Sequence, residues 1–249
     1  MRAGAFAATL LAGLALAGCE RDGKAPAAPV AEARAGTPLT FALSSADAEV
    51  KLALPAALAA HPTLHRTLYD NETRAMKAFM AEAGPQQAEY GAAMPPFAME
   101  VTWRVAAETP RLLSLVRESY DFAGGAHGNS ASMTLLFDKV AGREVAPATL
   151  FPAEASLPRL EGTLCNALKR VKAEAGAVPL DGETWSCPKW RDSQAALAPV
   201  AGGRATGLTF LFSPYEVGPY AEGGFEVTLP ATEFRADIAP AYRDQFVAD

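Results

Sequence analysis

Residues 207–230 have the sequence GLTFLFSPYEVGPYAEGGFEVTLP. Two short runs of β-type residues, 208–212 and 225–229, lie at its ends and predict a pair of strands. The connection between them holds two prolines, which fix φ, and three glycines, which permit φ > 0. We therefore expect an ordered loop at the tip of this strand pair, not a slack one.

The loop carries two tyrosines and two glutamates that are candidate binding residues. Tyr215 and Tyr220 offer rigid contact area at a low entropic cost, to a sugar face or to a protein, or they pack against the end of the sheet. Glu216 and Glu222 can pair with Arg or Lys of a basic partner, or they can remain solvated loop charges. The sequence leaves both alternatives open.

Apolar alternation upstream of this stretch predicts further strands. The alternation is strictest over 97–105 and weaker over 39–43 and 50–54. Two more strand-like runs, 112–122 and 130–138, follow after short turns. Parallel neighbours would need crossover connections of a dozen or more residues, so the short turns favour an antiparallel sheet.

Two stretches have helical periodicity. Residues 62–83 form an amphipathic pattern that begins at a proline and is expected to end before a Gly-Pro pair, and residues 158–175 carry a stripe of leucines. Residues 230–246 are expected to form a short terminal helix or turns. Together these elements predict an α+β fold class, an antiparallel sheet of several strands packed with two main helices, in a single domain at 39–249.

The charge balance limits the partners. The chain has a formal net charge of −6 and a pI near 5.2, and no cluster of Lys and Arg supplies the basic face that phosphate neutralisation needs. We therefore expect no nucleic-acid partner, whereas a basic protein would be attracted. His61 and His65 have the spacing of a metal pair but no third ligand in reach, so we expect no metal and no cofactor.

The N-terminus has the features of an export signal. A positive start and an apolar core precede Leu-Ala-Gly-Cys at 16–19, which resembles the bacterial lipobox. The resemblance implies a signal peptide at 1–18, cleaved before Cys19, which then carries lipid and anchors the chain at a membrane, facing the periplasm. An ordinary secretory signal with an incidental cysteine is the alternative. Glu20 favours the outer membrane if the host is Gram-negative, and 19–38 is expected to be a flexible tether.

Two cysteines remain once Cys19 is assigned to lipid. An even pair in an exported chain favours a disulfide between Cys165 and Cys187, which would stabilise the fold by roughly 3 kcal/mol. A zinc site is disfavoured, because two cysteines without nearby histidines lack the usual four ligands. The disulfide would tie the second helix to the polar loop around Trp185.

Two motifs carry a resemblance to a known family. The first is YDFAGGAHGN at 120–129, followed by LFD at 136–138, GR at 142–143 and LF at 150–151, and the second is the stretch 207–230 itself. Both resemble the signatures of a family of uncharacterised extracytoplasmic domains. That family occurs in the lysozyme-sensing anti-sigma factor RsiV and as an accessory domain of the peptidoglycan deacetylase PdaC.

The resemblance implies a compact α+β domain at the cell envelope whose relatives meet peptidoglycan or lysozyme. We expect only the recognition part of those relatives to apply, because the sequence shows neither a spanning helix nor a deacetylase module. The prediction is a lipid-anchored binding or sensing domain that contacts peptidoglycan or a cell-wall hydrolase such as lysozyme. The contacts are expected from the turn 124–129 and the loop 214–224.

His127 lies among the glycines of the first motif and has three interpretations. It can belong to a tight turn or β-bulge and bond to the backbone, it can contact a ligand with Asn129 beside it, or it can act as a general base. The last predicts a cell-wall or ester hydrolase in which Glu222 or Asp138 assists, without an identifiable serine relay. A structural envelope lipoprotein without a small ligand is the remaining alternative. The sequence favours a binding protein over an enzyme.

Overall fold

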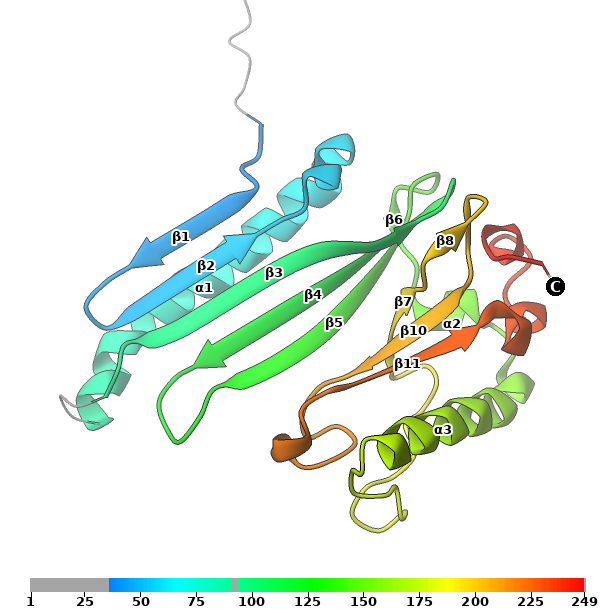
Figure 1. Cartoon of the computed structure of the whole chain (residues 1–249). Coiled ribbons are helices and arrows are strands. Elements are labelled where there is room, and N and C mark those ends of the chain that lie inside the picture. Colours follow the sequence, from blue (N-terminus) through cyan, green and yellow to red (C-terminus); the bar gives the residue numbers. More distant parts are fainter. Residues whose placement is uncertain (1–35, 91–93, 249) are drawn as a thin grey trace, which may run out of the picture. The chain divides into compact units, whose positions relative to one another are not determined.

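The computed structural model describes residues 36–90 and 94–248, and Figure 1 shows how their elements are arranged. The predicted signal peptide at 1–18 and the predicted lipid attachment site Cys19, with nearly all of the tether that follows it, lie outside these residues. From Thr37 onward the chain forms one compact unit.

Among the described residues, the first six strands form one sheet in the order in which they occur in the sequence. Every neighbouring pair is antiparallel except β2 and β3, which are parallel and are joined by the long helix α1. A parallel pair needs such a crossover, whereas the pairs joined by turns are antiparallel, as predicted. The strands are β1 (Thr40–Ser44), β2 (Ala48–Ala53), β3 (Phe97–Glu108), β4 (Leu112–Phe122), β5 (Asn129–Asp138) and β6 (Arg143–Glu144).

Helix α1 (Pro62–Tyr90) covers one face of this sheet (Figure 1). Its buried residues at three- and four-residue spacing share a hydrophobic cluster with inward residues of β2, β3 and β4. These residues include Leu64, Leu68 and Met76 on the helix and Val50, Val101, Trp103 and Leu115 on the strands. No helix in the described part of the chain is long and apolar enough to cross a membrane.

Helix α1 is longer than predicted, because it continues past Gly84 and Pro85 to Tyr90. A proline inside a helix removes one backbone hydrogen bond and costs about 3 kcal/mol. Contacts at the end of α1 offset this cost: Ala83 is buried in one cluster with Phe97, and the ring centroids of Tyr90 and Phe97 lie 6.2 Å apart. Tertiary packing therefore overrides the stop signal in the sequence.

A second sheet has the strand order β11-β10-β7 and is packed against helix α3 (Leu157–Glu174). Leucines of α3 and alternating residues of β10 and β11 share one hydrophobic cluster. The predicted strand pair is confirmed, since β10 and β11 pair antiparallel from Gly207↔Pro230 to Phe212↔Phe225. The strands are β7 (Gln194–Leu197), β10 (Gly207–Phe212) and β11 (Phe225–Pro230).

Shorter elements complete the unit. The chain after β11 forms three short 3-10 helices, in agreement with the expectation of a short helix or turns. The shorter elements are α2 (Pro147–Leu150), β8 (Val200–Ala201), β9 (Arg204–Ala205), η1 (Ala56–Ala60), η2 (Glu154–Ser156), η3 (Tyr220–Glu222), η4 (Ala231–Glu233), η5 (Arg235–Asp237) and η6 (Arg243–Gln245).

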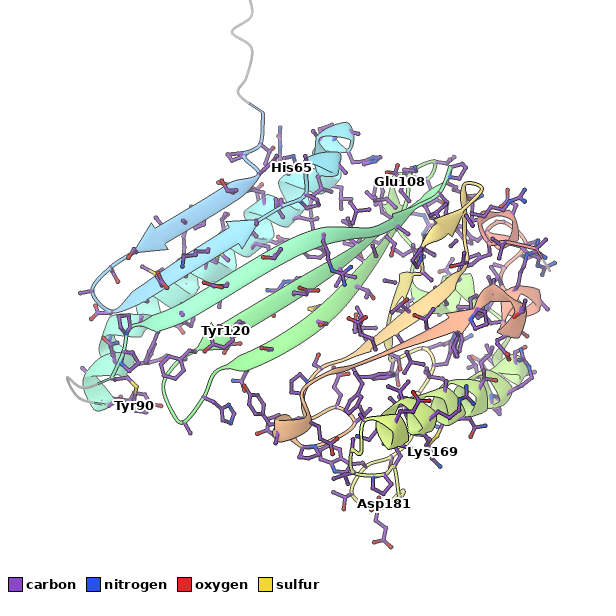
Figure 2. All side chains as sticks on the ribbon, in the orientation of Figure 1. His65, Tyr90, Glu108, Tyr120, Lys169 and Asp181 are labelled. Atoms are coloured by element: carbon purple, nitrogen blue, oxygen red, sulfur yellow. A yellow bond between two sulfur atoms is a disulfide. The ribbon has the colours of Figure 1, made fainter. Side chains whose placement is uncertain are left out.

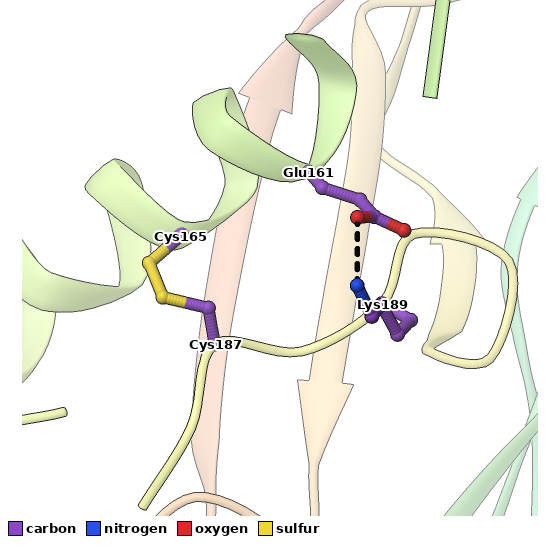
Figure 3. Close-up of a disulfide and its surroundings, with 4 residues drawn as sticks. All are labelled: Glu161, Cys165, Cys187 and Lys189. Atoms are coloured by element: carbon purple, nitrogen blue, oxygen red, sulfur yellow. Dashed lines mark hydrogen bonds and ion pairs between the residues drawn. A yellow bond between two sulfur atoms is a disulfide. The ribbon is translucent and has the colours of Figure 1, made fainter. Parts of the chain in front are cut away.

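The predicted disulfide is present and fastens α3 to the segment that follows it. Cys165 of α3 is bonded to Cys187, and Lys189 Nζ lies 3.2 Å from Glu161 Oε2 one turn away (Figure 3). The next residue, Trp190, is buried against β10, with its ring centroid 4.8 Å from that of Phe210. The polar segment between α3 and β7 is therefore held at its C-terminal end by three different interactions.

The second sheet covers only half of one face of the first. Residues 112–116 of β4 are buried on both faces, and Ser114 Oγ accepts a hydrogen bond of 3.0 Å from the backbone N–H of Leu197. Val116 packs in a small cluster with residues of β7 and β10. Beyond Val116, Glu118 and Tyr120 lie on the same face and are exposed. This uncovered half of the face, opposite α1, positions the candidate site.

Candidate functional site

The two sequence motifs meet at one backbone carbonyl. The glycine turn (residues 123–128) joins β4 to β5, and the tip loop (residues 213–224) joins β10 to β11. Tyr220 Oη donates a hydrogen bond of 2.8 Å to Gly128 O, and His127 Nδ1 lies 2.9 Å from the same oxygen. The rings of His127 and Tyr220 stack, with centroids 4.0 Å apart and an angle of 17° between their planes. Two predicted candidate residues are thus brought together from different sheets.

The tautomer of His127 follows from this geometry. A carbonyl oxygen only accepts hydrogen bonds, so Nδ1 carries the hydrogen that points to Gly128 O. In the neutral ring this leaves Nε2 as an acceptor. Of the three interpretations of His127, the bond to backbone in a tight turn describes the observed contact, and the exposed ring remains available to a ligand.

Two glycines of the turn make room for tyrosine rings. A Cβ on Gly128 would overlap the ring of Tyr120, and a Cβ on Gly124, whose φ is 92°, would lie 2.8 Å from the ring of Tyr90. Figure 2 labels Tyr90 at the end of α1 and Tyr120 on β4, both close to the turn. The glycines therefore permit close approach of aromatic rings, which is a packing reason for this part of the motif.

Tyr215 extends the stack outward from the tip loop. Its ring centroid lies 5.5 Å from that of Tyr220, and the residue is 54% exposed. Its φ of 72° is in the left-handed region, which is unusual for tyrosine and costs on the order of 1 kcal/mol. Glu216 beside it is also exposed. The rings of His127, Tyr220 and Tyr215 therefore lie in one row.

Glu222 fastens the tip loop to the second sheet's helix. Its Oε2 lies 2.7 Å from Nζ of Lys172 on α3, and its Oε1 accepts a bond of 2.5 Å from the backbone N–H of Val178. Lys172 is only 1% exposed, and its Nζ lies 4.2 Å from the ring centroid of Phe225. The hydrogen bond from Lys172, followed by that from Val178, lowers the pKa of Glu222. This carboxylate is engaged within the protein, in contrast to the exposed Glu216.

A groove of about 780 Å³ lies between the tip loop and the uncovered half of the first sheet. Its walls carry hydroxyl groups, carboxylates and two tyrosines, with backbone from the tip loop. The lining residues are Glu100, Thr102, Glu118, Ser119, Tyr120, Ser130, Ala131, Ser132, Phe212, Ser213, Pro214, Tyr220, Ala221, Glu222, Gly223 and Gly224. A second hollow of about 500 Å³ lies beside the glycine turn and shares Tyr120 with the groove.

Comparisons with known proteins match two separate regions of this chain. The family model described as deacetylase PdaC matches residues 44–130, and the model described as a protein of unknown function (DUF3298) matches residues 150–232. The chain carries both regions in this order. The resemblance predicted from the two motifs is confirmed, and it identifies a cell-envelope-associated domain.

Two solved structures share the fold. A DUF3298 family member from Bacteroides fragilis NCTC 9343 is 16% identical, with 82% of this chain and 93% of that chain covered and a TM-score of 0.56. A DUF3298 family protein from Pseudomonas aeruginosa PAO1 is 18% identical, with 85% and 98% covered and a TM-score of 0.54. None of the curated proteins matches the chain. At these identities the likeness shows the fold alone.

The groove lies where the two family regions meet. His127, Tyr120 and Glu118 belong to the PdaC region, whereas Tyr220 and Ser213 belong to the DUF3298 region. The stack of His127 on Tyr220 therefore joins one region to the other. Neither region alone forms the groove.

The groove contains residues that the sequence interpretation did not select. Glu100, Glu118 and Tyr120 lie on the sheet face opposite α1, where Glu118 accepts a bond of 3.0 Å from Arg104 and Glu100 one of 3.3 Å from Lys51. Strict alternation places all three on one face, and that signal was available in the sequence. Which half of the face stays open depends on the docking of the second sheet, for which the sequence has no local signal.

Asp138 belongs to a buried network. Its Oδ2 lies 2.7 Å from Nη2 of Arg111 and accepts a bond of 3.1 Å from Tyr242 Oη, and its Oδ1 accepts bonds of 2.9 Å from the backbone N–H groups of Val140 and Ala141. Burial alone would raise the pKa of Asp138, but the hydrogen bonds from Arg111 and the two backbone groups outweigh it and lower that pKa to about 2.

The prediction that Asp138 could assist His127 is wrong. His127 lies two residues before β5 and Asp138 is the last residue of β5, and a strand of 10 residues spans about 30 Å at roughly 3.3 Å per residue. Glu222, the other proposed assistant, is held by Lys172. In the described ranges, no hydrogen bond joins His127 to a carboxylate, and no group of three His, Cys, Asp or Glu side chains is placed to hold a metal. Asn129 is exposed at the start of β5, opposite Asp121.

Proposed function

We propose that this chain is a binding domain of the cell envelope that receives peptidoglycan in the groove between the tip loop and the first sheet. The observation that carries the proposal is the stack of His127 on Tyr220, which joins the two family regions at the rim of one polar groove. An anchor at Cys19 would hold the domain at a membrane that faces the cell wall. The proposed role is recognition rather than hydrolysis.

The chemistry of the groove suits a polymer with sugar rings and amide groups. Tyr120 offers an aromatic face and a hydroxyl group, and Thr102 and Ser132 add small hydroxyl groups on the same face of the sheet. Tyr220 also lines the groove, with its hydroxyl hydrogen donated to Gly128 O. A volume of about 780 Å³ is within the usual range for ligand sites.

A basic protein such as lysozyme is a second candidate partner. Tyr215 is 54% exposed beside the exposed Glu216, and neither residue lines the groove. A rigid tyrosine next to a carboxylate suits a protein surface that carries Arg or Lys. The net charge of −6 would steer a basic protein toward this domain.

The test is co-sedimentation of residues 20–249 with purified peptidoglycan, beside calorimetric titration with lysozyme at low and moderate salt. Tyr69 of α1, on the opposite side of the first sheet, is the control. Binding to peptidoglycan that is lost in Tyr220→Ala but kept in Tyr69→Ala would support the groove as the binding site. Binding to lysozyme that weakens with salt and in Tyr215→Ala would support the second candidate. Binding to neither partner would contradict both candidates.

A further inference from the structure

The outer edge of strand β5 runs along the groove. Hydrogen bonds on this edge involve the backbone of Ser132, Thr134 and Leu136: Ser132 N–H donates to Ser213 Oγ at 3.0 Å, Thr134 N–H donates to Gln194 Oε1 at 2.8 Å, and Leu136 O accepts from Val145 N–H at 2.8 Å. These residues are two apart. Even-numbered residues of β5 therefore direct their backbone groups away from β4.

The same parity applies to Ser130. The register of β4 and β5 is unbroken from Leu112↔Asp138 to Asp121↔Asn129, and beyond Asp138 the N–H of the odd-numbered Lys139 donates to Arg111 O on the β4 side. Gly128 O, two residues before Ser130, accepts the bond from Tyr220 on the outer edge. The N–H and C=O groups of Ser130 therefore face outward, and Ser130 lines the groove.

The protein occupies this edge on both sides of Ser130. Tyr220 takes Gly128 O, and Ser213, which is 8% exposed, takes the N–H of Ser132. Between them, no hydrogen bond within the described ranges is made to the outward N–H or C=O of Ser130. An uncovered strand edge pairs readily with another extended chain, and proteins usually cover such edges. Of the even-numbered residues 128–136, all within the described part of the chain, Ser130 is the one with neither outward backbone group in a hydrogen bond, and it lines the groove.

We propose that the groove binds an extended peptide that pairs with Ser130 of β5, and that this peptide carries a basic side chain. One residue of the peptide would exchange two backbone hydrogen bonds with Ser130, as in a hydrogen-bonded pair of an antiparallel ladder. The proposal rests on the proposed function and deepens it: in peptidoglycan, the bound part would be the peptide stem rather than the glycan chain.

The charges of the groove favour the basic side chain. Glu100, Glu118 and Glu222 line it, and no Lys or Arg does among the described residues. Each glutamate has one cationic partner outside the lining: Lys51 for Glu100, Arg104 for Glu118, and Lys172 for Glu222. The charged groups of the lining are therefore all carboxylates, and an ammonium group in the groove would meet them at short range.

The first test compares two substitutions at Ser130 in residues 20–249. Ser130→Pro removes the outward N–H without removing a bond to β4, whereas Ser130→Ala keeps the N–H and removes only the hydroxyl. The probe is acetyl-Ala-Lys-Ala-Lys-Ala-amide, titrated by NMR. We expect Ser130→Ala to bind as the parent does and Ser130→Pro to bind about tenfold more weakly. Equal affinity of the two variants would overturn the proposal.

A second test needs no protein variant, so a folding defect in Ser130→Pro cannot obscure the result. Analogues of the probe in which one amide at a time is replaced by an ester lose one N–H each. We expect the ester at one position to weaken binding about tenfold and the esters at the other positions to have no effect. A second probe, in which both lysines are replaced by glutamate, should bind more weakly than the lysine probe. A flat ester series would mean that no backbone bond to Ser130 O exists.

Competition separates this inference from the proposed function. Intact peptidoglycan is bound first, and the lysine probe or peptide-free glycan chains are added. Displacement by the probe supports the inference. If peptidoglycan binds and only glycan chains displace it, the inference fails and the proposed function stands. If the probe binds in the expected pattern but peptidoglycan does not, the proposed function fails alone.

Discussion

The two ends of strand β5 use polar groups in opposite ways. At the Asp138 end, side-chain and backbone donors fill both carboxylate oxygens, and Asp138 is fully buried. At the other end, Tyr220 and the exposed His127 both hydrogen-bond to Gly128 O, and the backbone of Ser130 opens into a groove. The closed end contributes to the stability of the fold, and the open end leaves polar groups available. The comparison teaches that one strand can do both when its two ends meet different neighbours.

The largest effect is expected from Asp138→Asn at the closed end. The substitution removes the charge that Arg111 and two backbone N–H groups stabilise, and breaking a buried ion pair costs about 3–5 kcal/mol. Urea unfolding measures the loss. Asp121→Asn, at the open end of the same hairpin, is the matched control and should change the free energy of unfolding by less than about 0.5 kcal/mol. Similar losses in both variants would contradict the contrast between the ends.

The disulfide gives a second large effect, on the side of the second sheet. Cys165 and Cys187 are 22 residues apart, and closing such a loop stabilises the fold by about 3 kcal/mol on the chain-entropy estimate. We expect Cys165→Ala combined with Cys187→Ala to lose that amount in urea unfolding. Dithiothreitol should destabilise the parent to the same extent and leave the double variant unchanged. A parent protein that is insensitive to reduction would show that the bond contributes little.

Acid should affect the closed end through Asp138. Its pKa is lowered from 3.8 to about 2 in the folded protein, so its contribution is fully present above about pH 4 and is lost as the pH falls toward 2. This lowering of the pKa by about 1.8 corresponds to about 2.5 kcal/mol at 1.36 kcal/mol per pKa unit. The measurement is the difference in unfolding free energy between the parent and Asp138→Asn from pH 6 to pH 2. A difference that stays constant over this range would remove Asp138 as the cause.

Much of the fold could be predicted because its signals are local. Strict alternation over 97–105 and short turns specified antiparallel neighbours, and the pair of cysteines specified the disulfide. The end of α1 could not be predicted, since the contacts of Ala83 and Tyr90 with β3 outweigh the proline at 85. The parallel pair β2 and β3 follows from this helix acting as a crossover.

The candidate site was predicted only in part. Sequence motifs pointed to His127 and Tyr220, which do meet, but nothing local indicated that their rings would stack across two sheets. The positive φ of Tyr215 has no sequence signal, because tyrosine rarely adopts it. Glu222 stands beside Tyr220 in sequence, yet its partner Lys172 comes from α3, fifty residues away. From the sequence alone, a glutamate that is bonded within the protein, such as Glu222, cannot be distinguished from an exposed one, such as Glu216.

The smallest effect expected is the energetic coupling between the two motifs at the open end. His127→Ala and Tyr220→Ala each remove one ring of the stack, and stacked aromatic pairs contribute about 0.5–1.5 kcal/mol beyond their buried area. A double-mutant cycle in urea unfolding should therefore give a coupling energy of about 1 kcal/mol. Tyr220→Phe keeps the ring and loses the bond to Gly128 O, so its cycle with His127→Ala separates stacking from hydrogen bonding. A coupling near zero with Ala at both positions would mean that the tip loop and the glycine turn are neighbours without mutual support, and the groove between them would then depend on Lys172 and Glu222 to hold its outer wall.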